Sequence, residues 1–152
     1  MRVIAGEYRG RPLLAPRGRA TRPTSDRVRE ALSRGALQAT LVDSGAAAIA
    51  AIERNLATLG IEAIVRRQDA LAFLRTARRD GRQYDLVFVD PPYDRVGRLR
   101  DELRAALVPV LSPGARVVAE SDRRSTLTLD LPLLTDRTYG DTRIQIYCHD
   151  PR

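Results

Sequence analysis

The chain has 152 residues, the length of one ordinary globular domain, and 43% of them are hydrophobic, which is enough to build a core. A single cysteine excludes a disulfide framework, and no cluster of Cys and His offers a structural zinc site. No apolar run approaches the roughly 18 residues that a membrane span needs, and the N-terminus lacks the apolar core of a signal peptide. We expect a soluble, cytoplasmic domain with no membrane segment and no metal.

The net charge of +7 is concentrated near the N-terminus. All 26 basic residues are Arg; residues 1–34 hold nine of them against three acids, a net of +6, and residues 35–152 hold a net of +1. Guanidinium groups stay charged and bind phosphate oxygens through two donors, so a dense Arg segment suits a nucleic-acid backbone. An Arg-only composition can also reflect genomic base composition and give a merely solvated surface, but it does not explain the clustering.

The first residues predict an extension followed by a helix. Residues 2–6 and 10–14 are expected to form two short strands of a hairpin, and Pro and Gly residues keep the next stretch extended or looped. A helix then begins near Asp26, after Thr and Ser residues that can cap it, and runs to Leu32. We therefore divide the chain into a basic extension, residues 1–24, and a main domain, residues 25–152.

From residue 39 onward the pattern alternates between strand and helix. Residues 46–59 have apolar side chains at helical spacing, and Gly60 supplies a stop. Residues 85–89 form an apolar run without alternation, which predicts the most buried strand, covered on both faces. Strands are predicted at 39–42, 63–65, 85–89, 115–119, 131–134 and 143–147, and helices at 46–59, through Leu71 and Leu74, and at 99–107. This alternation favours a parallel, doubly wound α/β sheet.

The tetrapeptide Asp90-Pro91-Pro92-Tyr93 follows the strand predicted at 85–89, at the edge where open α/β sheets place ligand sites. The two prolines fix two φ angles and leave carbonyls free to accept hydrogen bonds. The Asp90 carboxylate and the Pro91 carbonyl could accept bonds from an amino group on an aromatic ring, which frees the nitrogen lone pair, while Tyr93 could stack a flipped-out base. The alternative is a tight turn that Asp90 caps; the apolar run before it favours chemistry.

Two more acids follow predicted strands at the same edge. Asp43 follows residues 39–42 and is placed to bind the ribose hydroxyls of a nucleoside cofactor. Asp69 follows residues 63–65 and could accept a hydrogen bond from an adenine amino group. Each could instead cap the next helix. With Asp90 they give one acid per strand–helix unit, which favours a nucleoside site.

Five motifs spread over nearly the whole chain carry a family resemblance. They are residues 2–6 (RVIAG), 8–11 (YRGR), 21–36 (TRPTSDRVREALSRGA), 90–93 (DPPY) and 139–142 (YGDT). The DPPY motif alone is compatible with any amino-group methyltransferase of nucleic acids, but its combination with residues 22–30 is specific. The chain resembles the RsmD family of bacterial 16S ribosomal RNA guanine-N2 methyltransferases, which use S-adenosylmethionine.

The resemblance implies a Rossmann-like class I methyltransferase fold with an N-terminal β-hairpin extension. It implies Asp90–Tyr93 as the catalytic loop and Asp43, Asp69 and Asp90 as contacts of S-adenosylmethionine. It also implies that the basic extension helps to hold RNA. The candidate phosphate-binding residues are Arg9, Arg11, Arg22, Arg27 and Arg29.

One family feature is missing. The family places roughly thirty residues, with a first strand and a Gly-rich turn of the form D-L-x-A-G-S-G, between Leu32 and Ser33. Glu-Ala-Leu occurs on both sides of that stretch in the family, so the junction can shift by a few residues. Either this segment is absent only from the sequence as written, or the protein carries a genuine deletion. We favour the first, because a sheet without its central strand exposes the flanking strands.

We therefore expect methyl transfer from S-adenosylmethionine to the exocyclic N2 of a guanine in 16S rRNA, on naked rRNA or the assembled small ribosomal subunit. One alternative is an adenine-N6 methyltransferase acting on DNA, which uses the same loop chemistry, although no segment is long enough for a separate target-reading domain. The other is a non-catalytic RNA-binding module, which is expected if the Gly-rich turn is truly absent.

Overall fold

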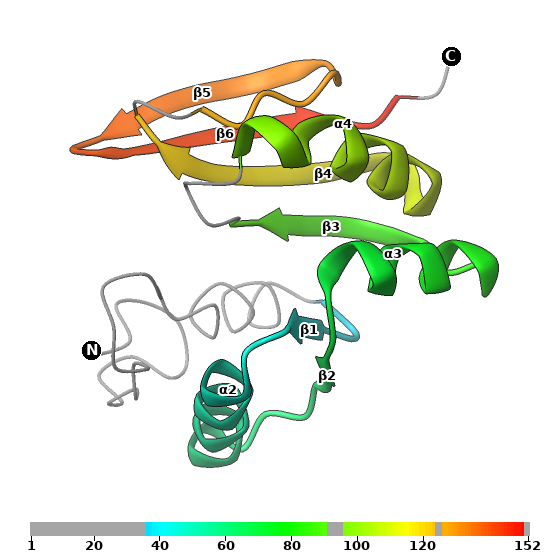
Figure 1. The fold of residues 1–152 in the computed structure, drawn as a ribbon, viewed down its shortest axis with the longest axis vertical. Helices are drawn as coiled ribbons and strands as arrows, with labels where there is room; N and C mark the ends of the chain where they lie inside the picture. The colour runs from blue at the N-terminus through cyan, green and yellow to red at the C-terminus, as the bar shows by residue number, and fades with distance from the viewer. Residues whose placement is uncertain (1–35, 91–95, 124–125, 151–152) are drawn as a thin grey trace. The chain divides into compact units, whose positions relative to one another are not determined.

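The computed structural model describes residues 36–90, 96–123 and 126–150, with the backbone alone for residues 96–100. The chain divides into two compact units, residues 1–70 and 71–152 (Figure 1). The predicted N-terminal hairpin, the helix ending at Leu32, the Leu32–Ser33 junction, the five candidate Arg residues and Pro91–Tyr93 lie outside the described residues. Predictions about them stay predictions.

The described part of the first unit is one strand–helix–strand motif. Strands β1 (Thr40–Asp43) and β2 (Ile64–Arg67) pair in parallel, with Thr40 opposite Ile64. Helix α2 (Ala46–Leu59) connects them. Its core is made by Leu41, Ile49, Ile52 and Leu56, all at most 8% exposed.

Helix α2 has the bounds that the sequence predicts. Gly60 follows it with φ of 66°, in the left-handed region that glycine adopts without strain, and its N–H donates to the carbonyl of Ala57 at 3.2 Å. The predicted helix at 46–59 and its stop at Gly60 are confirmed. The strand predicted at 63–65 is shifted slightly, to Ile64–Arg67.

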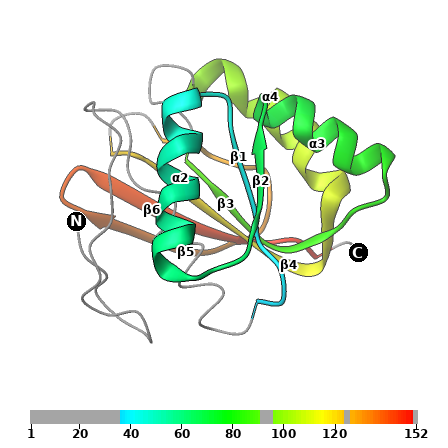
Figure 2. The same ribbon diagram turned by 90° about the horizontal axis from the view of Figure 1, so that it is seen from below.

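The second unit contains a four-stranded mixed sheet and two helices (Figure 2). In chain order its elements are α3 (Ala70–Arg79, which starts at the unit boundary), β3 (Tyr84–Val89), α4 (Val96–Leu107), a short 3₁₀ turn η2 (Val108–Val110), β4 (Leu111–Asp122), β5 (Leu133–Tyr139) and β6 (Thr142–Cys148). The strand order is β3-β4-β6-β5. Strands β3 and β4 are parallel, whereas β6 is antiparallel to both β4 and β5. The predicted parallel pairing is found between β3 and β4, and the C-terminal hairpin adds antiparallel strands, because its turn at Gly140 is too short for a parallel connection.

Helices α3 and α4 lie together and cover one face of this sheet (Figures 1 and 2). Leu74 from α3 and Leu107 from α4 belong to one buried cluster with Val117 of β4 and Tyr147 of β6. Val87 and Val89 of β3 pack against the same cluster. Since side chains alternate along a strand, Val87 and Val89 of β3, like Val117 and Ala119 of β4, face the helices, and the residues between them face the other side.

Strand β3 departs most from the prediction. It is the end strand of its sheet, and within the described residues only β4 pairs with it. Its side chains are half-buried or exposed, and Leu86 is 41% exposed. The prediction that residues 85–89 form the most buried strand, covered on both faces, is wrong for the part of the chain that the structure describes, because the helices there cover only one face and only β4 lies beside β3.

Candidate functional site

In the first unit, Asp43 and Asp69 lie at the same end of the paired strands. Asp43 is the last residue of β1 and is half-buried. Its backbone carbonyl accepts a hydrogen bond from the N–H of Gln68 at 3.1 Å, and Asp69 follows directly, exposed, before α3 begins. The structure therefore brings these two predicted residues together at the carboxyl edge of β1 and β2.

The turn after β1 is built around the Asp43 carboxylate. Oδ1 of Asp43 accepts a hydrogen bond from the backbone N–H of Gly45 at 2.7 Å. A Cβ at position 45 would lie 3.1 Å from that oxygen, so glycine allows the chain to turn closely around the carboxylate. This contact resembles the capping alternative, but it uses one oxygen of Asp43 and leaves the second able to accept from a ligand hydroxyl.

In the second unit, Asp90 follows β3 directly and is exposed. This is the carboxyl end of a parallel strand, the position in which α/β sheets place catalytic residues. Asp90 thus follows a strand as the sequence predicts, and its catalytic role stays a prediction; Pro91, Pro92 and Tyr93 of the same loop lie outside the described residues.

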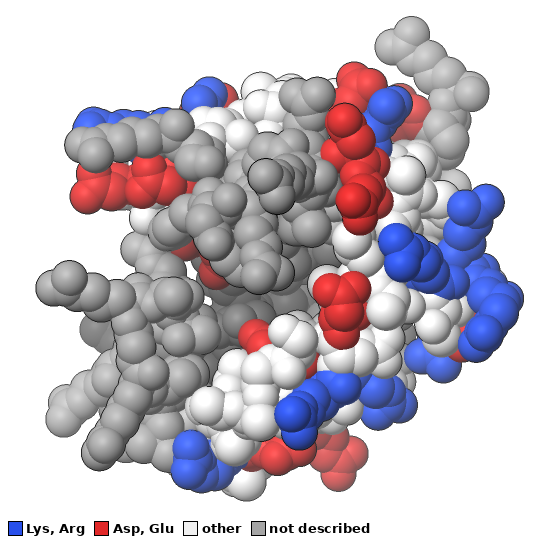
Figure 3. All heavy atoms as spheres, viewed as in Figure 1, with Lys and Arg blue, Asp and Glu red and all other residues white. Residues whose placement is uncertain are grey.

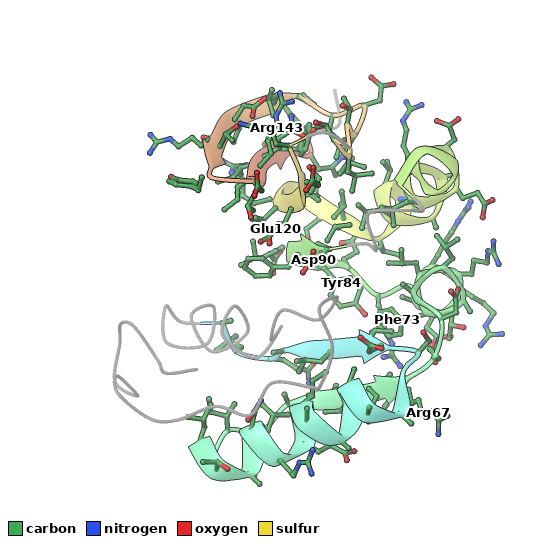
Figure 4. All side chains as sticks on the ribbon, turned by 60° about the vertical axis from the view of Figure 1, so that its left-hand side comes forward. Arg67, Phe73, Tyr84, Asp90, Glu120 and Arg143 are labelled. Atoms are coloured by element: carbon green, nitrogen blue, oxygen red, sulfur yellow. The ribbon has the colours of Figure 1, made fainter. Side chains whose placement is uncertain are left out.

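A second acid at this end is not among the predicted residues. Val89, the last residue of β3, pairs with Ala119 of β4; Asp90 follows Val89, and Glu120 follows Ala119 within β4. Figure 4 shows the two side by side, Asp90 just after the end of β3 and Glu120 near the end of β4. Glu120 is only 3% exposed. The signal in the sequence was an acid directly after an apolar strand, the same signal that singles out Asp90.

One basic group in the described part of the second unit lies away from Asp90. Arg78 and Arg79 occupy the last turn of α3, and Arg82 follows (Figure 3). Asp80 forms ion pairs with Arg79 and with Arg82, both at 3.5 Å. This basic group lies before the start of β3, whereas Asp90 lies after its end, so it does not supply phosphate contacts beside Asp90.

Metal and membrane sites are not seen among the described residues. No group of three or more His, Cys, Asp or Glu side chains is arranged to hold a metal ion there. No helix in the same residues is long and apolar enough to cross a membrane.

Comparison with known proteins extends over nearly the whole chain. The family model described as "Conserved hypothetical protein 95" matches residues 1–32 and 30–148. YlbH of Bacillus subtilis is 32% identical, covering 97% of this chain and 98% of its own length, and Ribosomal RNA small subunit methyltransferase D of Escherichia coli is 35% identical over 62% of this chain and 61% of its own length. The structure of yhhF from Escherichia coli superposes with a TM-score of 0.77 at 30% identity, covering 100% of this chain and 99% of that one.

The comparisons also show where the chain is shorter than its relatives. The match to YlbH extends over 185 positions, at least 33 more than the 152 residues of this chain. The family model matches the chain in two segments, and residues 30–32, Glu-Ala-Leu, belong to both: they end the first matched segment and begin the second. Across this break both parts of the chain match in order, and the chain belongs to the "Conserved hypothetical protein 95" family, the RsmD family of methyltransferases.

Proposed function

We propose that this chain transfers a methyl group from S-adenosylmethionine to the exocyclic N2 amino group of a guanine in 16S rRNA of the small ribosomal subunit. The relatives from Escherichia coli and Haemophilus influenzae are named Ribosomal RNA small subunit methyltransferase D, which supports the RNA substrate. The observation that carries the proposal is the exposed Asp90 at the carboxyl end of β3, where the D-P-P-Y loop begins. With this substrate we propose a cytoplasmic location.

In this proposal Asp90 makes the target amino group more nucleophilic. The lone pair of an exocyclic amino nitrogen is delocalised into the purine ring, so the group is a poor nucleophile. When the Asp90 carboxylate and the Pro91 carbonyl accept the two N2–H bonds, the nitrogen becomes more tetrahedral and its lone pair is freed. The carboxylate is also placed to accept the proton that N2 loses once it is methylated, and Tyr93 stacks the flipped base.

The described residues fit only part of S-adenosylmethionine. The free oxygen of Asp43 suits the ribose hydroxyls, and Asp69 on the same edge suits the adenine amino group. The methionine part requires a close backbone approach in a Gly-rich turn, and no two glycines of the 152 residues are closer than four positions. When bound, the cofactor supplies an electrophilic methyl group. We assign the contacts to its methionine part, which this chain lacks, to the segment of at least 33 further positions in the alignment with YlbH.

The RNA contacts are assigned to the basic extension. Residues 1–34 carry a net charge of +6, which suits a phosphate backbone better than the balanced remainder of the chain. The basic group at the end of α3 is partly neutralised by Asp80 and lies at the opposite end of β3 from Asp90. Five residues are the candidate phosphate contacts: Arg9, Arg11, Arg22, Arg27 and Arg29.

The substitution Asp90→Ala tests the assigned chemistry. We expect it to abolish methyl incorporation into 16S rRNA and into assembled small subunits, because the amino group is no longer held or polarised, while RNA binding persists. The measurement is incorporation of labelled methyl groups beside an RNA-binding titration. Asp130→Ala is the matched control, since the Asp130 side chain is 78% exposed and forms an ion pair with the exposed Arg104. Normal turnover by Asp90→Ala would refute the role.

A further inference from the structure

Glu120 is an unusual residue for its position. It lies in β4 directly after Val117, Val118 and Ala119, an apolar run, and is 3% exposed. Burying a carboxylate costs free energy unless it is paired, so an apolar residue would suit the fold at least as well. Glu120 does interact with another group of the chain. A buried acid at the ligand edge of a parallel strand pair marks a candidate functional residue.

Asp90 and Glu120 lie next to each other where β3 ends. The last β3–β4 pair is Val89 with Ala119, whose side chains face the helices. Because side chains alternate along a strand, Glu120 of β4 faces the opposite side. Asp90 is the first residue after β3, and Figure 4 shows it beside Glu120. Two carboxylates are therefore neighbours here, one exposed and one buried.

Two adjacent acceptors match only one of the two purines. The Watson–Crick edge of guanine offers neighbouring donors, N1–H and the N2 amino group. In adenine an amino group stands beside N1, which carries a lone pair and no hydrogen. A second carboxylate therefore attracts the guanine edge and repels the adenine edge.

We propose that Glu120 accepts the N1–H of the target guanine while Asp90 holds its N2 amino group, so that Glu120 sets the preference for guanine over adenine. This proposal rests on the proposed function. The entering base takes over the contact that Glu120 makes within the chain. A base with a donor at N1 can replace that contact, whereas a base with a lone pair at N1 cannot, and such differences at buried polar sites give strong discrimination.

The test replaces the target guanosine with 2-aminopurine riboside in a 16S rRNA segment that the wild-type chain methylates. This analogue keeps the N2 amino group but has a lone pair at N1. The wild-type chain is expected to prefer guanosine by at least about tenfold. Glu120→Gln, whose amide can donate to that lone pair, is expected to lower the guanosine-to-analogue rate ratio by about tenfold or more. A merely structural role of Glu120 lowers both rates together.

Two further variants make the outcome decisive. Glu102→Gln makes the same chemical change on the exposed surface of α4 and is expected to keep the wild-type ratio. Glu120→Asp keeps the carboxylate and is expected to keep the guanosine preference at a reduced rate, even if Glu120→Gln folds poorly. An unchanged guanosine-to-analogue rate ratio in Glu120→Gln, or loss of the guanosine preference in Glu120→Asp, overturns the role of Glu120 and leaves the proposed function standing. A wild-type chain that methylates no guanosine overturns the proposed function as well.

Discussion

An ion pair joins the last two strands to the segment before them. Arg143 donates from Nε and Nη2 to the two carboxylate oxygens of Asp136, at 2.8 and 2.6 Å. Gln145 donates to the same carboxylate at 3.1 Å, and Nη1 of Arg143 donates to Thr126 at 3.1 Å. The hydrogen bond from Arg143 lowers the pKa of Asp136, and the same bond raises the pKa of Arg143. The network fixes the β5–β6 hairpin, which adjoins β4 and Glu120.

The substitution Asp136→Asn makes the contribution of this pair measurable. Since the folded-state pKa of Asp136 is below its unfolded value, the pair stabilises the fold above the unfolded pKa of about 3.9 and loses this effect as pH falls through the folded pKa. Wild type is therefore expected to be more stable than the variant at pH 7, with a difference that shrinks in acid. Urea unfolding from neutral to acidic pH measures it. A difference independent of pH would contradict the assignment.

At the scale of elements, sequence patterns predict the bounds of a helix or strand better than they predict which elements pack beside it. Helix α2 was predictable to its bounds because its apolar spacing and the stop at Gly60 are local signals. The exposure of β3 was not predictable, because an apolar run indicates that a strand is buried but does not say which other elements cover it. Asp90 was found by its motif. Glu120 has no motif, and only the register between β3 and β4 places it beside Asp90.

The open edge of β3 predicts self-association. Leu86 is 41% exposed on a strand that pairs on one side only within the described residues, and exposed apolar edges bind other chains. Leu86→Lys is expected to reduce association as concentration rises, because a charge at a strand edge opposes pairing. Sedimentation of both chains over a concentration series measures this. Equal association by the two chains would show that the edge of β3 is not involved.

At the scale of the whole molecule, each of the two sheets ends on an open parallel edge among the described residues, β1 in one and β3 in the other. The alignment with the relative from Bacillus subtilis has at least 33 more positions than this chain has residues. A strand, a turn and a helix need about 30 residues. One such unit would supply a neighbour for an open edge and the Gly-rich turn together. This explains why the described residues fit the nucleoside part of the cofactor and not the methionine part.

The affinity for S-adenosylmethionine follows from this difference. The 152-residue chain is expected to bind the cofactor at least about tenfold more weakly than the Escherichia coli relative, because hydrogen bonds to the charged methionine end are lost. Insertion of the extra segment of YlbH between Leu32 and Ser33 is expected to restore the affinity. Titration calorimetry on the three proteins measures it. Equal affinity without the insertion would show that the 152 residues hold the whole cofactor.

The most direct test of the proposed function identifies the product. The chain is incubated at saturating S-adenosylmethionine, carrying a labelled methyl group, with 16S rRNA and with assembled small subunits, and the RNA is digested to nucleosides. The label is expected in N2-methylguanosine, with wild-type Asp90 required. Label in N6-methyladenosine, or no incorporation into either RNA at saturating cofactor, would contradict the account.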